Sequence, residues 1–295
     1  MAGAGQPPPA PDILSRVAEQ AELLAQKAPL VLTRETLEQR ATVLRPPRIR
    51  IGKAATEPLK PQGKVRTIVS EYTVAPLKGS ASKDLLEFRQ VISVDGHPVQ
   101  SAESARHALS LGVQSPDDRE RKRMLEDFAH YGLQDLGTDY AMILLAFTNR
   151  GQEDMLILPS GEERIGGDNA LVFSWQQRSP AKGELLFDGS QAARLPLAGK
   201  LWVGKSDGLP LRVWVWAIRQ SSKRSIRDEA TVDYVMSPHG FMAPVSVHHQ
   251  HIVDGQTTTE NLFRYEPFKL FGADSEIKFS PAPGSPSPAP SQPPP

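Results

Sequence analysis

The spacing of apolar residues changes along the chain, from a helical period near the amino terminus to strict alternation further on. The first apolar positions recur every three or four residues: Ile13, Leu14, Val17, Ala21, Leu24 and Ala25. This period predicts an amphipathic helix that Asp12 caps and Pro29 ends. A second, weaker helical stretch is predicted over residues 34–41, and Pro46-Pro47 closes the segment.

From residue 65 the alternation is typical of β-strands. Two strands are predicted over Val65–Ala75 and Leu85–Val94, with a turn segment at residues 76–82 between them. Helical patterns follow at about residues 102–111 and again after Ser115-Pro116. After Gly137 almost every apolar stretch is a predicted strand, at residues 141–148, 154–158, 170–176, 183–188, 200–204, 211–218, 230–236, 243–252, 257–265 and 276–279.

These late strands are separated by turn signals every eight to fifteen residues, with no helix between them. Parallel strands need longer crossovers, so the connections must be antiparallel. A sheet of this length curls, and one of its faces must be covered. The predicted fold is therefore α+β and mostly antiparallel β: a curled half-open β-barrel with helices on its concave side.

Composition divides the chain into four parts. Residues 1–11 are an N-terminal run of Pro, Gly and Ala, and residues 281–295 are a tail of Pro, Ser and Ala, so we expect both ends to be disordered. Residues 12–47 form the predicted N-terminal helical segment. Residues 60–280 form the predicted curled β domain, with helices near residues 102–135.

Charge and residue content exclude several classes of function. Lys+Arg and Asp+Glu both number 34, so there is no cationic excess for extended nucleic-acid binding. The chain has no cysteine, which excludes disulfides and thiolate metal sites. It has no apolar run long enough for a membrane-spanning helix. Small residues and prolines at the start are typical of a chain from which a signal peptide has been removed, which predicts a periplasmic or otherwise exported protein.

The run Gly204-Lys-Ser206-Asp-Gly208 matches the G-x-S-x-G pattern of a nucleophile elbow. That chemistry needs the serine on a sharp turn from a strand into a helix. Here an alternating strand pattern follows from Leu211, so the interpretation is a hairpin turn. We found no catalytic constellation with supporting context and predict a protein that is not an enzyme, with no cofactor.

Three histidines carry the best candidate for metal binding. His249 and His251 point to the same face of a predicted strand, whereas His248 points to the other. A closed zinc site needs four ligands, and the third would have to be His239 or a carboxylate such as Asp233. The favoured interpretation is two ordinary surface histidines on a polar sheet face.

A strand that is apolar on both faces carries the candidate ligand site. In residues 211–218, Trp214 and Trp216 share one face, and Leu211, Val213, Val215 and Ala217 share the other. Such a strand is either buried on both sides or lines a cavity. The residues predicted to line a cavity are Trp202, Trp214 and Trp216, with Leu125 and Phe128 contributed by a helix.

Four short stretches carry a family resemblance: residues 65–72, 87–96, 202–212 and 261–279. In their order they resemble a group of uncharacterised exported proteins of acidobacteria, over about residues 60–280. That group resembles, in fold pattern, the periplasmic lipoprotein carriers and their outer-membrane receptors, the lipoprotein localisation factors. The resemblance implies a half-open antiparallel barrel with helices in its concave side, which holds an acyl chain or another apolar ligand.

The leading hypothesis is a non-catalytic cell-envelope protein that binds a lipid, an acyl chain or a lipidated protein in its curled sheet. Each buried acyl methylene stabilises such a complex by about 0.8 kcal/mol, so a few contacts suffice. The alternative is a structural or interaction module of the envelope with a fully packed core. The third and least favoured hypothesis is a metal-dependent enzyme built around His249 and His251.

Overall fold

The computed structural model describes residues 10–43, 62–76, 85–114, 123, 126–128, 130–178, 184–188, 191–221 and 224–271. The described helices are α1 (Ala10–Lys27), η1 (Ala28–Leu30), α2 (Ala102–Gln114), η2 (Tyr140–Phe147) and α4 (Asn149–Gln152), of which η1 and η2 are 3-10 helices. The strands are β1 (Val31–Val43), β2 (Gln62–Pro76), β3 (Leu85–Val94), β4 (His97–Pro98), β5 (Met155–Ile165), β6 (Asp168–Gln177), β7 (Glu184–Asp188), β8 (Gln191–Leu195), β9 (Ala198–Gly204), β10 (Pro210–Ser221), β11 (Arg224–Met236), β12 (Met242–Val253), β13 (Gln256–Tyr265) and β14 (Lys269–Leu270).

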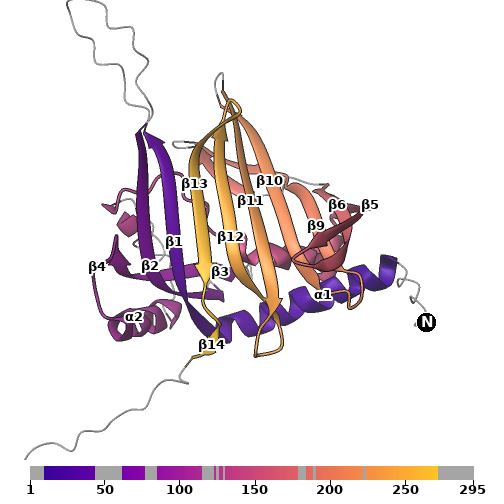
Figure 1. Cartoon of the computed structure of the whole chain (residues 1–295), viewed down its shortest axis with the longest axis horizontal. Coiled ribbons are helices and arrows are strands. Elements are labelled where there is room, and N and C mark those ends of the chain that lie inside the picture. Colours follow the sequence, from indigo (N-terminus) through magenta and orange to yellow (C-terminus); the bar gives the residue numbers. More distant parts are fainter. Residues whose placement is uncertain are drawn as a thin grey trace, which may run out of the picture.

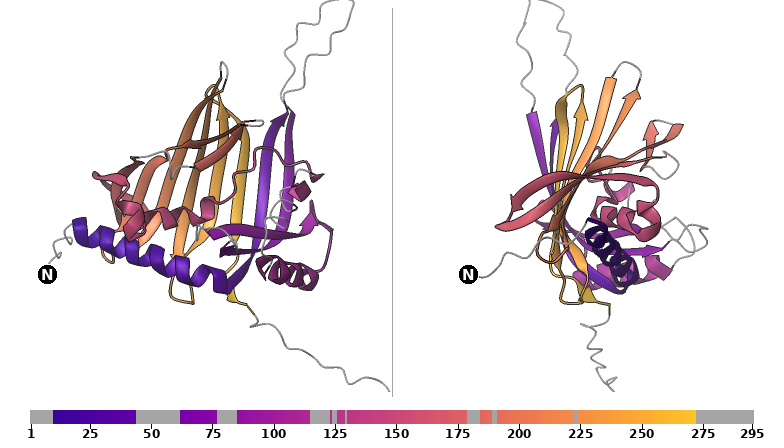
Figure 2. Two further views of the ribbon diagram at one scale, coloured as in Figure 1. Left: turned by 180° about the vertical axis from the view of Figure 1, so that it is seen from behind. Right: turned by 90° about the vertical axis from the view of Figure 1, so that its right-hand side faces the viewer.

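One large antiparallel sheet dominates the molecule (Figure 1). Its strand order is β4-β3-β2-β1-β13-β12-β11-β10-β9-β6-β5, with β14 also paired to β1, whereas β7 and β8 form a separate two-stranded sheet. The pairing of β1 with β13 joins the two ends of the chain, with Leu37 opposite Phe263. The path begins at β4 and ends at β5, so the sheet is open, and an edge-on view shows that it curls (Figure 2). The predicted class, mostly antiparallel β in a curled half-open sheet, is confirmed.

Helix α1 lies along the inner, concave face of the sheet (Figure 2). It buries one stripe of side chains at helical spacing, and Ile13, Val17, Ala21 and Leu24 are each at most 3% exposed. The predicted helix is thereby confirmed. It begins at Ala10, so Asp12 lies in its first turn instead of capping it.

The core lies between α1, η2 and the inner face of the sheet. Strand alternation supplies the sheet's share, because Val213, Val215 and Val232 all point inward and are fully buried. Each fully buried side chain of this size contributes about 1.5–3 kcal/mol relative to exposure. Helices α1 and η2 therefore fill much of the concave side, and Leu195 of the small β7–β8 sheet also packs against this core.

Helix α2 covers a different surface from the one expected of the helices near residues 102–135. Tyr72 and Val74 of β2 point into the main core, whereas Ala75 packs with Phe88 of β3 and Leu109 of α2 in a separate small cluster. Neighbouring strand residues face opposite sides, so α2 packs on the reverse face of β2 and β3. Both faces of these two strands are consequently buried.

Two predicted elements are wrong. Residues 34–41 lie in β1 and not in a helix, so the segment 12–47 is helical only in its first part. Their helix-forming composition is overridden by pairing with β2 and β13 on both sides. Residues 141–148 do not form a strand, because Tyr140–Phe147 is a 3-10 helix. A short run that is apolar all round does not distinguish a buried strand from a buried helix.

The other predicted strands within the described residues agree with β2, β3, β5, β6, β7 and β9 to β13 in place and direction. Strands β4, β8 and β14 were not predicted. The predicted strand at residues 276–279, the tail at residues 281–295 and residues 1–9 lie outside the described residues. The N-terminal run was predicted to be disordered over residues 1–11, and this is wrong for Ala10 and Pro11, which begin α1.

Candidate functional site

A row of polar side chains crosses the inner face of the sheet under the helices. We call it the inner polar row; each member is at most 8% exposed, and its residues are Glu35 and Gln39 of β1, Glu87 and Arg89 of β3, Asp228 of β11, His249 and His251 of β12, and Thr259 and Asn261 of β13. The strand register places these residues beside one another. Burial of so many polar groups is costly unless each is paired with a hydrogen-bond or charge partner.

Two histidines of the row share one carboxylate. His251 Nδ1 lies 2.6 Å from Asp228 Oδ1, and His249 Nε2 lies 3.6 Å from the same oxygen. On its other side His249 Nδ1 accepts a hydrogen bond from Asn261 Nδ2 at 3.0 Å. That bond assigns the His249 proton to Nε2, where it faces Asp228.

The same contacts set the ionisation of this cluster. Burial would raise the pKa of Asp228, but hydrogen bonds from His249 and His251 outweigh it and hold that pKa well below its usual value. The hydrogen bond to Asp228 raises the pKa of His251 against the opposing effect of burial. Asp228 is therefore ionised at neutral pH and favours the protonated form of His251.

A second cluster of the row surrounds Arg89. Its guanidinium binds Glu35 through two parallel hydrogen bonds of 2.7 and 2.8 Å and lies 2.6 Å from Glu87. The guanidinium also lies over the rings of Tyr72 and Phe263, at 4.9 and 5.4 Å from their centroids. Burial raises the pKa of Glu35, and the nearby Arg89 opposes that rise. Two carboxylates thus share one buried cation.

The segment Gln134–Asp139, which we call the strap, crosses the inner polar row. Gln39 binds Gln134 twice, donating to its carbonyl at 2.8 Å and accepting from its amide at 2.9 Å. Asn261 donates to the carbonyl of Asp135 at 3.1 Å, and Thr259 donates to the Asp135 carboxylate at 3.3 Å. The strap is therefore held to the sheet by side-chain hydrogen bonds.

Close approach of the strap to the histidine cluster requires a glycine. A Cβ on Gly137 would lie 2.5 Å from Cδ2 of His249, a distance that real Cβ atoms essentially never show. The next turn brings Tyr140 onto the same imidazole, with the two rings stacked at 5.2 Å and 25°. His249 is thus enclosed by the strap above and by Asp228 and Asn261 at its sides.

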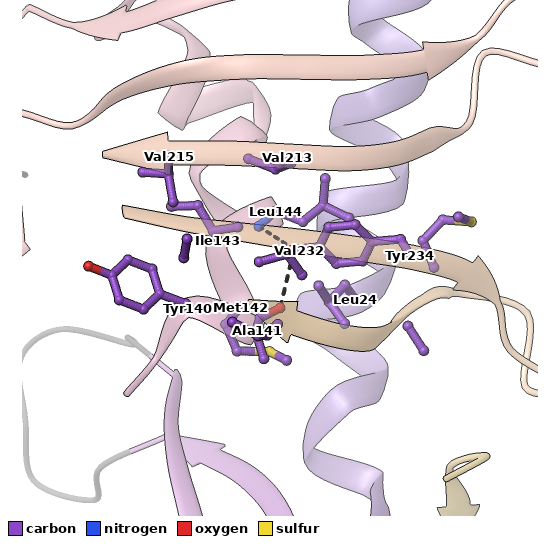
Figure 3. Close-up of a cluster of buried hydrophobic side chains, with 14 of the residues drawn as sticks. Leu24, Tyr140, Ala141, Met142, Ile143, Leu144, Val213, Val215, Val232 and Tyr234 are labelled. Atoms are coloured by element: carbon purple, nitrogen blue, oxygen red, sulfur yellow. Dashed lines mark hydrogen bonds between the residues drawn. The ribbon is translucent and has the colours of Figure 1, made fainter. Parts of the chain in front are cut away.

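The strap leads into η2, which we call the plug and which fills the concave side (Figure 3). Six of its eight residues are buried, among them Leu144 and Phe147 with no exposed area. Phe147 meets the ring of Trp175 edge-on at 5.2 Å. The Tyr234 hydroxyl donates to the Ala141 carbonyl and accepts from the Leu144 amide, both at 3.2 Å. One side chain of the sheet therefore binds two backbone groups of the plug.

The structure places the residues predicted to line a cavity on two different faces of the sheet. Trp214 alternates with the inward-pointing Val213 and Val215, so it lies on the outer face with Trp216. Trp202 is also on the outer side, in a small cluster with Val172, and its Nε1 donates to Glu163 at 2.8 Å.

Phe128 is buried in the main core on the inner side, and Leu125 lies outside the described residues. The three tryptophans thus lie together on the outer face, because Trp214 packs against the cluster of Trp202 and against the ring of Trp216, whereas Phe128 lies on the inner side. Their role in ligand binding stays a prediction.

The histidines differ from their expected setting. His249 and His251 are 2% and 8% exposed, so the interpretation as surface residues is wrong. The reason is that β12 is an interior strand whose inner face is covered. His248 points outward as predicted and pairs with Glu260 at 2.7 Å.

The remaining candidates for a metal site lie apart from the histidine pair. His239 lies in the β11–β12 turn, where its Nε2 is 2.9 Å from the Phe268 carbonyl, and Asp233 pairs with Arg212 on the outer face. Over the described part of the chain, no group of three or more His, Cys, Asp or Glu side chains is placed to hold a metal ion.

The G-x-S-x-G sequence forms the turn between β9 and β10, as predicted. Gly208 has a φ of +71°, which glycine adopts without strain, and its amide donates to the Gly204 carbonyl at 2.9 Å. No helix follows Ser206, so the nucleophile-elbow geometry is not formed.

Sequence reasoning missed the arginine cluster and Gln39. Glu87 and Arg89 alternate with Phe88, a pattern that indicates a polar, solvent-facing side of a strand. In the structure that side faces the main core, and α2 covers the Phe88 side, so both faces of β3 are buried. Gln39 was hidden by the helical interpretation of residues 34–41. The i, i+2 spacing of His249 and His251 was the one signal that located part of the row.

No family model matches the chain, and no curated protein matches it. Solved structures do. A LolA-superfamily protein from Nitrosomonas europaea is 10% identical, with 87% of this chain and 93% of that chain covered and a TM-score of 0.34. A domain described as an outer membrane lipoprotein-sorting protein, from Vibrio parahaemolyticus, is 10% identical, with 90% and 97% covered and a TM-score of 0.36. A DUF1329 family protein from Desulfovibrio piger is 9% identical, with 88% and 94% covered and a TM-score of 0.36.

The expected resemblance to lipoprotein carriers is thus matched among the structural neighbours. The association with acidobacteria has no support in them. At these identities and TM-scores, the likeness decides nothing about the ligand or partner of this chain. The functional case rests on the inner face itself.

Proposed function

We propose that this chain is a non-catalytic protein of the cell envelope that binds an apolar ligand or a lipidated partner on the inner face of its sheet, in the place of the plug. The plug is the observation that carries the proposal. It is an eight-residue 3-10 helix, whereas 3-10 runs beyond three or four residues are uncommon. Its buried side chains, Met142, Ile143, Leu144 and others, make contacts of the kind that an acyl chain makes.

The strength of the strap's attachment agrees with a reversible exchange. Its four hydrogen bonds to Gln39, Asn261 and Thr259 contribute about 0.5–1.5 kcal/mol each. Burial of an acyl chain returns about 0.8 kcal/mol per methylene. An acyl chain of ordinary length therefore offsets the loss of these bonds, and its contacts with the inner face must also replace those of the buried plug side chains.

The remaining parts of the proposal concern location and partner. A periplasmic or otherwise exported location is the setting in which lipids and lipidated proteins meet a carrier of this kind. Among the described helices, none is long and apolar enough to cross a membrane. The rival is a structural module of the envelope whose packed core never opens.

Titration with a fluorescent fatty acid tests the proposal. We expect saturable binding by the whole chain, and tighter binding after Gln39→Ala, because two of the bonds that hold the strap are removed. If Gln39→Ala destabilises the state in which the strap is bound to the sheet by about 1.4 kcal/mol, the apparent affinity for the fatty acid should rise about tenfold.

Gln250→Ala is the matched control, since Gln250 follows His249 on β12 and points to the outer face. It should bind as the unaltered chain does. A titration that stays flat for the whole chain and for Gln39→Ala contradicts the proposal and favours the packed module.

A further inference from the structure

An aromatic surface lies on the outer face of β10, away from the plug. We call it the outer aromatic surface; it consists of Trp214, Trp216 and Ile218 of β10 with Arg227 of β11. The two indole rings are 4.4 Å apart and tilted by 43°, and the Arg227 guanidinium lies 5.5 and 5.3 Å from their centroids. Ile218 is 49% exposed, and both tryptophans are partly exposed.

This surface is held in place from below, and within the described part of the chain no helix covers it. Val213, Val215 and Ala217 anchor β10 in the core from the inner side. Glu229 holds Arg227 at 2.7 Å. The described helices pack elsewhere, with α1 and η2 on the inner face and α2 on β2 and β3. Two fixed indole rings therefore form a rigid apolar ledge with N–H donors at its rim.

We propose that residues 281–295 of this chain, which we call the proline tail, bind the outer aromatic surface as a polyproline II helix. Eight of these fifteen residues are proline and none is charged. Proline-rich segments adopt polyproline II at low entropic cost, and aromatic-lined surfaces recognise them by packing against the proline rings. The carbonyl groups of such a helix are free to accept hydrogen bonds from indole N–H groups.

The geometry of the sheet places the tail within reach. The described chain ends at Phe271, whose amide donates to the Leu30 carbonyl beside the start of β1. From β1 to β10 the path crosses β13, β12 and β11, four strand spacings or about 19 Å. Strand register aligns Trp214 with Glu38, seven residues along β1 from Val31, or about 24 Å.

These two components amount to about 31 Å in a flat sheet, and the path over the convex outer face is longer. The ten steps from Phe271 to residue 281 extend to about 33–36 Å, and each further residue of the tail adds about 3 Å. Prolines of the tail can thus arrive at the outer aromatic surface. The prolines at positions 7–9 are a poorer candidate, because they directly precede α1 on the inner face.

Indole N–H signals in nuclear magnetic resonance test the proposal, because the chain has only four tryptophans. Deletion of residues 281–295 should shift the signals of Trp214 and Trp216 and leave that of the buried Trp175 unchanged. A peptide with the sequence of the tail, added to the deletion variant, should restore both signals saturably. The same peptide with its prolines replaced by alanine should not. Deletion of residues 2–9 is the matched control and should shift neither signal.

Two further measurements make the result decisive. Trp216→Ala in the deletion variant should weaken the peptide about tenfold or more, as loss of a central aromatic anchor does. The signals of the whole chain should not depend on protein concentration. Signals that move on dilution would overturn the proposal by assigning the occupant to a second copy, and signals that the deletion leaves unchanged would overturn it outright.

Discussion

His251 and Asp228 form a buried ion pair across β12 and β11, with 2.6 Å between Nδ1 and Oδ1 and both side chains about 10% exposed. The same carboxylate oxygen faces His249 at 3.6 Å. One acid thus orients two imidazoles directly beneath the strap. This relationship links the stability of the inner face to pH.

The decrease in the free energy of unfolding as pH rises should depend on His251. Its pKa is raised in the folded protein, so its contribution is complete below the ordinary histidine value of about 6.5 and is lost as pH rises through the raised value. The free energy of unfolding from urea denaturation should therefore fall above pH 6.5. His251→Gln should flatten this decline. His248→Gln, on the outer face and 42% exposed, should not; equal slopes in all three proteins would refute the link.

The decrease in the free energy of unfolding at acidic pH should depend on Asp228. Its pKa is lowered, so its contribution is present above the ordinary value of about 3.9 and is lost as pH falls below it. Asp228→Asn should destabilise the protein at pH 6 by about 1–3 kcal/mol, because it removes the ionised partner of a buried histidine. Asp254→Asn is a control for an exposed carboxylate in a turn, where urea denaturation should detect a smaller change.

Breaking the arginine cluster should cost more than breaking a surface pair. Arg89→Ala leaves Glu35 and Glu87 buried without their cation, and we expect a loss of about 3–5 kcal/mol in the free energy of unfolding. Arg40→Ala removes a pair with Glu38 on the outer face, where the arginine side chain is 63% exposed, and should cost at most about 1 kcal/mol. Comparable losses in the two variants would contradict the expectation that Glu35 and Glu87 are costly to bury without Arg89.

Gly137→Ala should disturb the strap locally. The added methyl group must displace His249 or the strap, at a cost of about 1–3 kcal/mol typical of overpacking. The imidazole signals of His249 should shift in nuclear magnetic resonance as its stacking on Tyr140 changes. Gly63→Ala, where the new Cβ meets nothing within 4 Å, is the control and should leave those signals in place.

Removal of a core side chain from α1 tests how firmly this helix is attached to the sheet. Leu24 has no exposed area and lies in the main core, so Leu24→Ala should lower the free energy of unfolding by about 2–5 kcal/mol. Gln26→Ala, on the exposed side of the same turn, should change it by less than about 0.5 kcal/mol. Thermal or urea denaturation of both variants gives the comparison.

Where the sequence pattern and the environment agreed, prediction succeeded. The strands from β9 to β13 have period-two alternation and turn residues between them, and all five were predicted, although the strand predicted at residues 230–236 begins six residues after the start of β11 at Arg224. The apolar stripe of α1 was found for the same reason. Prediction failed at β1 and at the plug, where Glu35 and Gln39 are polar residues in buried positions and Tyr140–Phe147 is apolar on every side.

The sequence by itself determined the antiparallel connections, the helix α1, the turn at Ser206 and the sharing of one face by His249 and His251, because these depend on spacing within a single element. Only the tertiary structure decided which face of each strand is the inside. Trp214 and Glu87 show why: alternation separates two faces of a strand but does not say which one other elements will cover. The inner face is covered by α1, the strap and the plug, which are distant in sequence from β3 and β10, and this cover places the polar stripe of β3 inside and leaves the aromatic stripe of β10 outside.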